Sequence, residues 1–366
     1  MDFSQLDTPS LLLDLEKLET NIEKIALFAQ SQGIGLRPHI KTHKSVRIAK
    51  MQLSKGAVGI TVAKLSEAEE MVKGGITNIL IAYPIASKQK LERLSHLLRR
   101  ASIIITADSV EQVECLEQFF SSKSLNVTLW IKVNSGLNRC GVEPGEEVIE
   151  LARRINSSQH LTLTGIFTHA GHAYGAKSIE EIKQIARQEA KSVVQSADAC
   201  EKIGIPIIHR SVGSTPTFTY AGMYKGITEI RPGNAAFFDM VQVSLGVANV
   251  EQCAVSILAT VVSKKKNHLV LDAGSKALTL EKGAHGNESV NGYGTIVGHP
   301  ELTLSRLSEE HGVATFIDST PLELNDVVTI IPNHACPVVN LYEVYHVIKD
   351  NTVIETWSID ARGKVY

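Results

Sequence analysis

Short apolar runs alternate with longer amphipathic stretches over the first two-thirds of the chain. The apolar runs are rich in β-branched residues, as buried parallel strands are, and they cover residues 33–40, 57–63, 78–83, 102–107, 126–133, 161–169, 205–213 and 227–233. Between them the apolar positions follow a helical period and predict helices over 15–33, 66–75, 87–100, 109–120, 145–155 and 178–204. This order predicts an α/β fold, a (β/α)₈ TIM-type barrel. An open doubly wound sheet is the alternative, but no GxGxxG follows the first strand.

The pattern changes after about residue 240. Strand-like runs separated by glycine and polar turns follow, and helical periodicity is nearly absent; the runs cover 241–247, 253–264, 268–274, 295–299, 312–317, 326–332 and 340–348. We therefore expect a barrel domain over 1–240 and a mostly antiparallel β domain over 241–366. The first dozen or so residues could join the β domain.

Composition excludes several classes of protein. The net charge is −2 with no long basic run, which argues against nucleic acid or an anionic membrane as the main partner. Five scattered cysteines without a CxxC pair indicate reduced thiols. No apolar run is long enough to span a membrane, and the N-terminus lacks the pattern of a secretion signal. We expect a cytoplasmic protein.

Cationic and hydroxyl side chains gather where the predicted strands end, which is where barrel enzymes place their active sites. Carboxylates are almost missing there, so a glycosidase, which needs paired carboxylates, is disfavoured. A donor-rich mouth suits an anionic ligand such as a phosphate. The residues at these ends include Arg37, His39, Lys41, His43, Lys44, Lys132, Arg139, His169, His172, Tyr174, Ser214, Thr215, Arg231 and Asn234.

Two of these segments have both a plain and a functional interpretation. Lys41 could be a solvated loop lysine, or a desolvated amine able to form a Schiff base. The turn Gly213-Ser214-Thr215 could be a simple helix start, or its N–H and hydroxyl groups could hold a phosphate. The Pro-Gly turn after Arg231 would lie beside it, where barrels commonly bind phosphate.

His334 and Cys336 are two residues apart in a strand-like part of the β domain. Residues at i and i+2 of a strand share a face, and a histidine with a cysteine is half of a zinc site. A buried cysteine beside a structural histidine is the alternative.

Several motifs together resemble the fold-type III pyridoxal-phosphate enzymes, which include alanine racemase, and within them the D-threonine aldolase and D-serine dehydratase family. The resemblance covers nearly the whole chain, through RPHIKTHK (37–44), KVNSGLNRCGV (132–142), GIFTHAG (165–171), SVGSTP (211–216), EIRPGN (229–234), LDAGSKAL (271–278) and PNHACPVVNL (332–341).

The resemblance implies a role for each matching residue. Lys41 would carry pyridoxal 5'-phosphate as a Schiff base, His169 would pack on the cofactor ring, Arg139 would approach its phenolic oxygen, and Arg231 would face its pyridine nitrogen. Gly213, Ser214 and Thr215, with Gly233 and Asn234 beside them, would bind the phosphate. His334 and Cys336 would bind a divalent metal; zinc is favoured, and manganese or magnesium is possible. Lys41, His169 and Tyr174 are the candidate catalytic residues, and His172 lies close enough in sequence to assist.

Departures from the family pattern narrow the function. No GYxDG-like segment supplies the second base of a racemase, which disfavours racemisation. His-x-Cys is typical of the dehydratases and His-x-Asp of the aldolases, so the resemblance favours a lyase that converts a D-3-hydroxy amino acid to a keto acid and ammonia. The alternatives are a D-threonine aldolase, an amino-acid racemase, a non-catalytic pyridoxal-phosphate protein, and a barrel for another phosphorylated ligand contacting Lys44 and Arg139. By analogy with the family we expect a homodimer.

Overall fold

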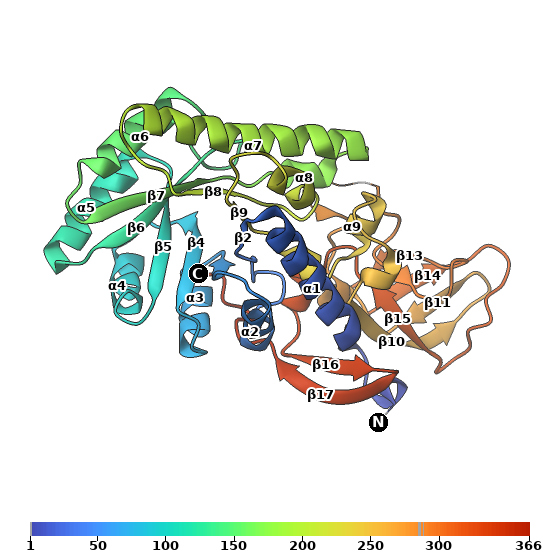
Figure 1. Cartoon of the computed structure of the whole chain (residues 1–366). Coiled ribbons are helices and arrows are strands. Elements are labelled where there is room, and N and C mark those ends of the chain that lie inside the picture. Colours follow the sequence, from blue (N-terminus) through green and yellow to red (C-terminus); the bar gives the residue numbers. More distant parts are fainter. Residues whose placement is uncertain (1, 285–286, 288) are drawn as a thin grey trace.

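The first of two sheets is a curled parallel barrel (Figure 1). The computed structural model describes residues 2–284, 287 and 289–366. The strands follow the order β2-β9-β8-β7-β6-β5-β4-β3, and a parallel bridge between His39 and Thr61 joins the two ends of that row. Their bounds are β2 Gly35–Leu36, β3 Ile60–Val62, β4 Asn78–Pro84, β5 Ser102–Ala107, β6 Val127–Lys132, β7 Leu161–Phe167, β8 His209–Val212 and β9 Glu229–Ile230. The predicted barrel is confirmed, and each predicted apolar run overlaps one of these strands.

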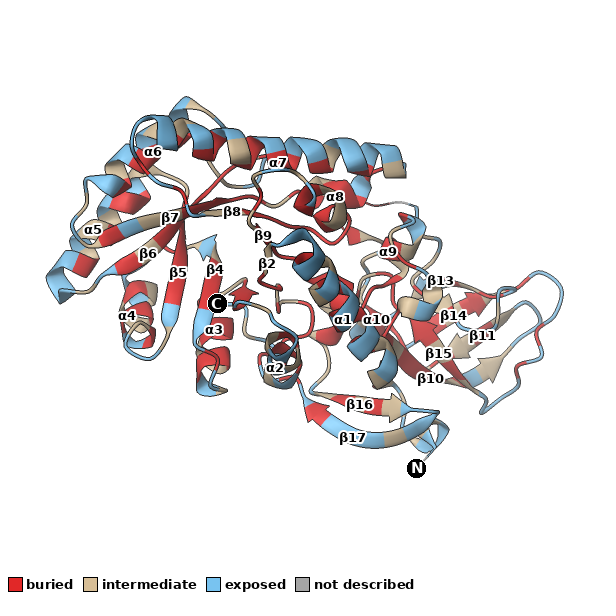
Figure 2. Cartoon of the chain, in the orientation of Figure 1, coloured by how far each residue is buried: buried red, intermediate tan, exposed pale blue. Residues whose placement is uncertain are grey.

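Helices surround the barrel and turn one apolar face toward it (Figure 2). They are α1 Leu15–Gln32, α2 Val46–Ser54, α3 Leu65–Lys73, α4 Lys88–Leu97, α5 Val110–Lys123, α6 Glu146–Asn156, α7 Ile179–Lys202 and α8 Phe218–Gly222. Helix α1 shows why the sequence predicted most of them. The Asp14 side chain caps its start by accepting the Lys17 N–H, and Gly33 ends it in the left-handed region. Helices α2 and α8 lie outside the predicted helical ranges.

The second sheet is mostly antiparallel and takes in the N-terminal strand β1 Ser10–Asp14. Its order is β13-β14-β11-β10-β1-β16-β17, with β15 on β10 and β12 on β15. Strand β1 pairs antiparallel with β10 and parallel with β16. The remaining bounds are β10 Val255–Lys264, β11 His268–Leu271, β12 Thr295–Ile296, β13 Thr303–Leu307, β14 Gly312–Thr315, β15 Val327–Ile331, β16 Val344–Lys349 and β17 Thr352–Ser358.

A short helix replaces one of the strands predicted after residue 240, and another predicted strand, over 340–348, starts later than expected. Residues 241–247 form most of α9 Met240–Ser244 and the turn after it, because Asp239 caps the helix by accepting the Gln242 N–H. Residues 340–343 precede strand β16 and follow α11 Ala335–Val339. The other short helical segments are α10 Ser275–Leu278 and the 3₁₀ turns η1 Phe3–Gln5, η2 Gly171–Gly175, η3 Asn234–Ala236 and η4 Val250–Gln252. Among the described residues no helix is both long and apolar enough to cross a membrane.

Three contacts fix the β domain against the mouth of the barrel. The Tyr345 hydroxyl donates to the His43 carbonyl at 2.7 Å, and the Ala361 N–H donates to the Lys44 carbonyl at 2.9 Å. The Ala335 N–H donates to Asp239 Oδ2 at 2.9 Å. The loop after β2 and the start of α11 are thereby held beside one cavity, which both segments line.

Candidate active site

A cavity of about 400 Å³ lies at the carboxyl ends of the barrel strands, against the β domain. This size is ordinary for a small-molecule or cofactor site. The structure brings together in its wall Lys41, Arg139, His169, Tyr174, Gly213, Ser214, Thr215, Arg231, Gly233, Asn234, His334 and Cys336. His172 is not among the described residues that line it.

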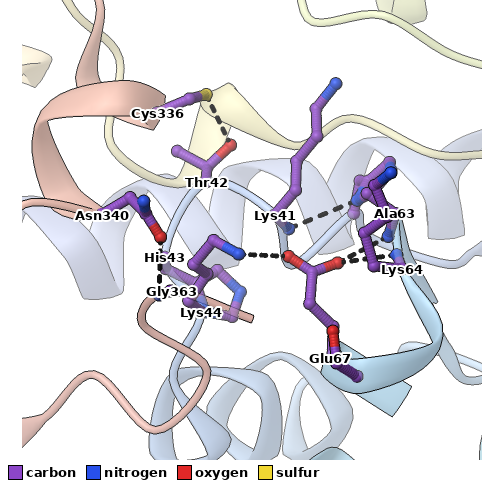
Figure 3. A network of polar contacts seen from close by, with 12 residues as sticks. Lys41, Thr42, His43, Lys44, Ala63, Lys64, Glu67, Cys336, Asn340 and Gly363 are labelled. Carbon is purple, nitrogen blue, oxygen red and sulfur yellow. Dashed lines mark hydrogen bonds and ion pairs between the residues drawn. The ribbon is translucent and has the colours of Figure 1, made fainter. Parts of the chain in front are cut away.

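Lys41 extends into this cavity from the loop that follows β2 (Figure 3). The loop is a tight turn, because the Ile40 carbonyl accepts the N–H groups of both His43 and Lys44. Burial lowers the pKa of Lys41, although the neighbouring Cys336 opposes the shift. An amine with a lowered pKa spends more of its time neutral, which is the form that attacks an aldehyde or accepts a proton.

Lys44, the second lysine of the same loop, forms a buried ion pair. Its Nζ lies 2.6 Å from Glu67 Oε1, and both side chains are buried. Glu67 also accepts the N–H groups of Ala63 and Lys64 (Figure 3). Glu67 therefore meets the charge of Lys44 inside the protein. Both lysines line the cavity, but this ion pair involves Lys44 and not Lys41.

Arg231 is buried, and hydrogen bonds to the barrel fix its guanidinium group. Its guanidinium donates to the Ser211 hydroxyl at 2.6 Å and to the Thr168 carbonyl. Burial lowers its pKa to about 10, so it still carries its proton at neutral pH. A permanent cation thus faces the cavity from the end of β9.

Two glycines stand at close backbone approaches, one between the turns after β8 and β9 and the other between the turn after β9 and the loop after β2. A Cβ on Gly213 would lie 2.9 Å from backbone atoms of Arg231, and one on Gly233 would lie 3.0 Å from the His39 carbonyl oxygen. The Tyr174 hydroxyl bonds to Thr215 in this turn, and burial raises the pKa of Tyr174 far above its ordinary value. Tyr174 is therefore neutral and supports the turn through Thr215, while the catalytic role expected from the sequence stays a prediction.

His169 has a defined neutral form. Its Nδ1 lies 2.6 Å from the Gly213 carbonyl oxygen, which can only accept, so Nδ1 carries the hydrogen and Nε2 does not. Burial holds the pKa of His169 well below its ordinary range. An uncharged, oriented ring is the form that can lie flat against a cofactor.

His334 and Cys336 face the cavity from a different local structure than expected. Strand β15 ends at Ile331, His334 is the residue before α11, and Cys336 is in its first turn. The prediction of a strand here was wrong, because the Ala335 N–H is bonded to Asp239 and starts a helix. The two side chains nevertheless bond to one another, and charge attraction between them raises the pKa of His334 and lowers that of Cys336 against the effect of burial.

Comparisons with known proteins cover both parts of the chain. The family model for the alanine racemase N-terminal domain matches residues 13–241, and the one for a serine dehydratase domain matches residues 254–348. D-threo-3-hydroxyaspartate dehydratase of Delftia sp. (strain HT23) is 32% identical, over 96% of this chain and 97% of the relative.

Solved structures agree with these matches. D-threonine aldolase from Filomicrobium marinum has a TM-score of 0.92 and 31% identity, over 100% of this chain and 97% of that one. A cysteine-to-alanine variant of D-threo-3-hydroxyaspartate dehydratase, in a metal-free form, has a TM-score of 0.92 and 30% identity, over 98% of both chains. The chain belongs to the D-threonine aldolase and D-serine dehydratase family of fold-type III pyridoxal-phosphate lyases.

The residues of this fold-type III lyase fit the cofactor. The cavity combines an amine of lowered pKa, a buried guanidinium and two turns in which a Cβ on glycine would clash.

The residues of the cavity fit a divalent metal as well. His334 Nδ1 lies 3.0 Å from Glu281 Oε2, as the second nitrogen of a metal-binding histidine usually contacts a carboxylate. Among the described residues no group of three or more His, Cys, Asp or Glu is placed to hold a metal, so water or substrate would complete the coordination.

Some residues of the site were missed from the sequence. Glu281, Thr42, Glu67 and Ser211 contact the candidate residues. Thr42, whose hydroxyl lies 3.1 Å from the Cys336 sulfur, belongs to a motif already singled out and could have been found. Glu281 and Glu67 come from distant segments and carried no signal.

Proposed function

We propose that the chain is a pyridoxal-phosphate- and divalent-metal-dependent lyase of D-3-hydroxy amino acids that eliminates the β-hydroxyl to give a keto acid and ammonia. The observation that carries the proposal is that Lys41 and the His334–Cys336 pair line one cavity. A single substrate could then reach both a base for its Cα proton and a metal, held by His334 and Cys336, for its β-hydroxyl.

The cofactor would supply an electron sink for the Cα carbanion, and the metal would supply a Lewis acid for the departing hydroxyl. Lys41 would hold the cofactor and, once its amine is released, remove the Cα proton from its own face of the site. Arg231 would keep its proton and stay fixed by Ser211 and Thr168. His169, which is neutral and oriented by the Gly213 carbonyl, would position the cofactor ring without adding charge.

The turn after β8 would bind the phosphate of the cofactor and so orient the cofactor in the cavity. Ser214 and Thr215, with the close glycines on either side, would hold the phosphate, and Tyr174 would support Thr215. Arg139 and Asn234 also line the cavity, where Arg139 can meet a negatively charged oxygen of cofactor or substrate.

Retro-aldol cleavage to glycine and an aldehyde is the second candidate. It is favoured by the likeness to D-threonine aldolase, whereas the His-x-Cys pair and the likeness to a dehydratase favour elimination. Because the relatives are lyases, racemisation and a non-catalytic role have less support, and so has another phosphorylated ligand, since Lys44 is bound to Glu67.

Product analysis tests the proposal. Protein loaded with pyridoxal 5'-phosphate and Zn²⁺ is incubated with D-serine, D-threonine and D-threo-3-hydroxyaspartate, and the keto acid, glycine and the L-enantiomer are measured together. We expect a keto acid with equimolar ammonia. Glycine as the main product would establish the aldolase, a D/L mixture the racemase, and no product with any of the three would overturn the proposal. Mn²⁺ and Mg²⁺ in place of Zn²⁺ test the metal.

We also propose a cytoplasmic homodimer, by analogy with the family. Sedimentation of the loaded protein should give twice the chain mass of 39.8 kDa. A monomer with full activity would overturn the dimer.

A further inference from the structure

Glu189 is a buried carboxyl group behind the anion-binding turn that the reaction described above does not use. It is on α7 and is 0% exposed. One oxygen, Oε1, accepts the N–H groups of Gly213 at 3.0 Å and Ala170 at 3.2 Å. The other, Oε2, lies 2.6 Å from the Thr217 hydroxyl. The carboxyl group thus joins the segments that follow β7 and β8.

No described lysine, arginine or histidine forms an ion pair with Glu189. Arg231, at the end of β9, is the charged group that acts on it, but its guanidinium donates to Ser211 and Thr168 instead. His169 and Tyr174, on the neighbouring segments, are uncharged, since burial lowers the pKa of the first and raises that of the second. Burial also raises the pKa of Glu189. An ionised Glu189 would place a negative charge close to a phosphate bound at the turn and repel it.

A chain of hydroxyl groups connects Glu189 to the cavity. Ser214 Oγ lies 2.8 Å from Thr217 Oγ1, and either can donate to the other. Ser214 lines the cavity. The direction of the whole chain therefore depends on whether Glu189 carries a proton.

If Glu189 is ionised, it must accept, so Thr217 donates to it and Ser214 donates to Thr217. The Ser214 hydrogen then points away from the cavity, and only lone pairs face a phosphate. If Glu189 is neutral, it donates from Oε2 while Oε1 keeps its two N–H partners. Thr217 then donates to Ser214, and Ser214 donates into the cavity.

We propose that Glu189 is protonated when the phosphate is bound and directs the Ser214 hydrogen to it through Thr217. Phosphate binding then takes up a proton at Glu189, a group outside the reacting atoms. This positioning role rests on the proposed function, since it assumes that the turn holds the phosphate of the cofactor.

Glu189→Gln gives a direct test. The amide oxygen can accept the two N–H groups and the amide nitrogen can donate to Thr217, so glutamine imitates the neutral acid permanently. The ligand is pyridoxine 5'-phosphate, which lacks the aldehyde and does not bond covalently to Lys41. Its affinity is measured by calorimetry between pH 6.5 and 9.5, with pyridoxine as the control without a phosphate.

We expect wild-type affinity to fall relative to the variant as pH rises, by up to ~10-fold per pH unit for one coupled proton. The titration of the phosphate itself is shared by both proteins and cancels in this ratio. The affinities of the two proteins should approach each other toward the lowest pH. Thr217→Val, which interrupts the chain, should weaken binding about 10-fold at low pH, and Glu189→Gln added to it should have no further effect.

Two results would overturn the role of Glu189 while leaving the proposed function intact. One is a wild type and a Glu189→Gln variant with the same pH profile. The other is a variant that folds, judged by circular dichroism, and binds at least 10-fold more weakly at every pH. A wild type that binds no pyridoxine 5'-phosphate at any pH overturns both proposals.

Discussion

The guanidinium of Arg231 donates to the hydroxyl of Ser211 at 2.6 Å, where the interior of the barrel meets the cavity. Ser211 donates in turn to Glu229 Oε1 at 2.8 Å, and Glu229 Oε2 accepts from Arg37 Nε at 2.9 Å. All four side chains are buried. A continuous polar chain therefore runs through the barrel and fixes the cation at its mouth.

Ser211→Ala should loosen Arg231. The variant leaves one N–H of a buried cation without its partner, so we expect a loss of about 1.5–3 kcal/mol in the free energy of unfolding and a shifted absorbance maximum of the bound cofactor. Urea denaturation and a visible spectrum measure the two. Ser122→Ala, at an exposed position, is the control. If both variants behave alike, Ser211 does not position Arg231.

Lys41→Ala should remove the covalent attachment of the cofactor. We expect the visible absorbance of the bound cofactor to disappear and kcat to fall by at least about 10²–10⁴-fold, because the base for the Cα proton is lost as well. Dialysis followed by a spectrum and a product assay measures both effects. Lys50→Ala removes an exposed lysine nearby and should change neither. An unchanged spectrum in the Lys41 variant would contradict its assignment.

Glu281→Gln should weaken metal binding without affecting the cofactor. Glu281 contacts His334 Nδ1 at 3.0 Å, and the loss of such a partner typically costs 10- to 100-fold in metal affinity. Competition with a chelator measures the affinity for Zn²⁺, and absorbance measures retained cofactor. Glu310→Gln removes a carboxylate from an exposed ion pair and serves as control. Equal metal affinity in both variants would exclude Glu281 from the metal site.

Much of the fold could be predicted because its signals are local. Alternating apolar runs and amphipathic stretches located the eight barrel strands, and a cap such as Asp14 or a left-handed Gly33 marks a helix end within a few residues. The error at His334 and Cys336 has the opposite cause. The apolar run around them resembles a strand, but the bond from the Ala335 N–H to Asp239 comes from 96 residues away and makes a helix.

In the candidate site, too, the residues in local motifs could be predicted and those that act through distant contacts could not. Lys41, Ser214 and Arg231 stand in short motifs at strand ends, so the sequence could bring them together through the topology of the barrel. Glu67, Glu189 and Glu281 act through contacts across the fold, with Lys44, the turn after β8 and His334 respectively. A lone carboxylate in an amphipathic helix or loop looks like a solvated residue until its partners are known.

His43 should make stability fall in acid. It is fully buried, accepts the Ser45 N–H at Nδ1 and faces Gln52 Oε1 with Nε2, so the neutral ring satisfies both partners. Burial lowers the pKa of His43 from an ordinary value near 6.5 to about 3. Above pH 6.5 the ring is neutral in both states. As pH falls from 6.5 toward 3, only the unfolded chain takes up the proton, and stability is lost by up to about 1.4 kcal/mol per pH unit. His43→Asn should lower stability at pH 8 but reduce the further loss on going to pH 5 by about 2 kcal/mol, as measured by urea denaturation. His311→Asn, at an exposed position, should keep the wild-type dependence on pH, and a His43 variant that keeps it too would show that other groups carry the acid sensitivity.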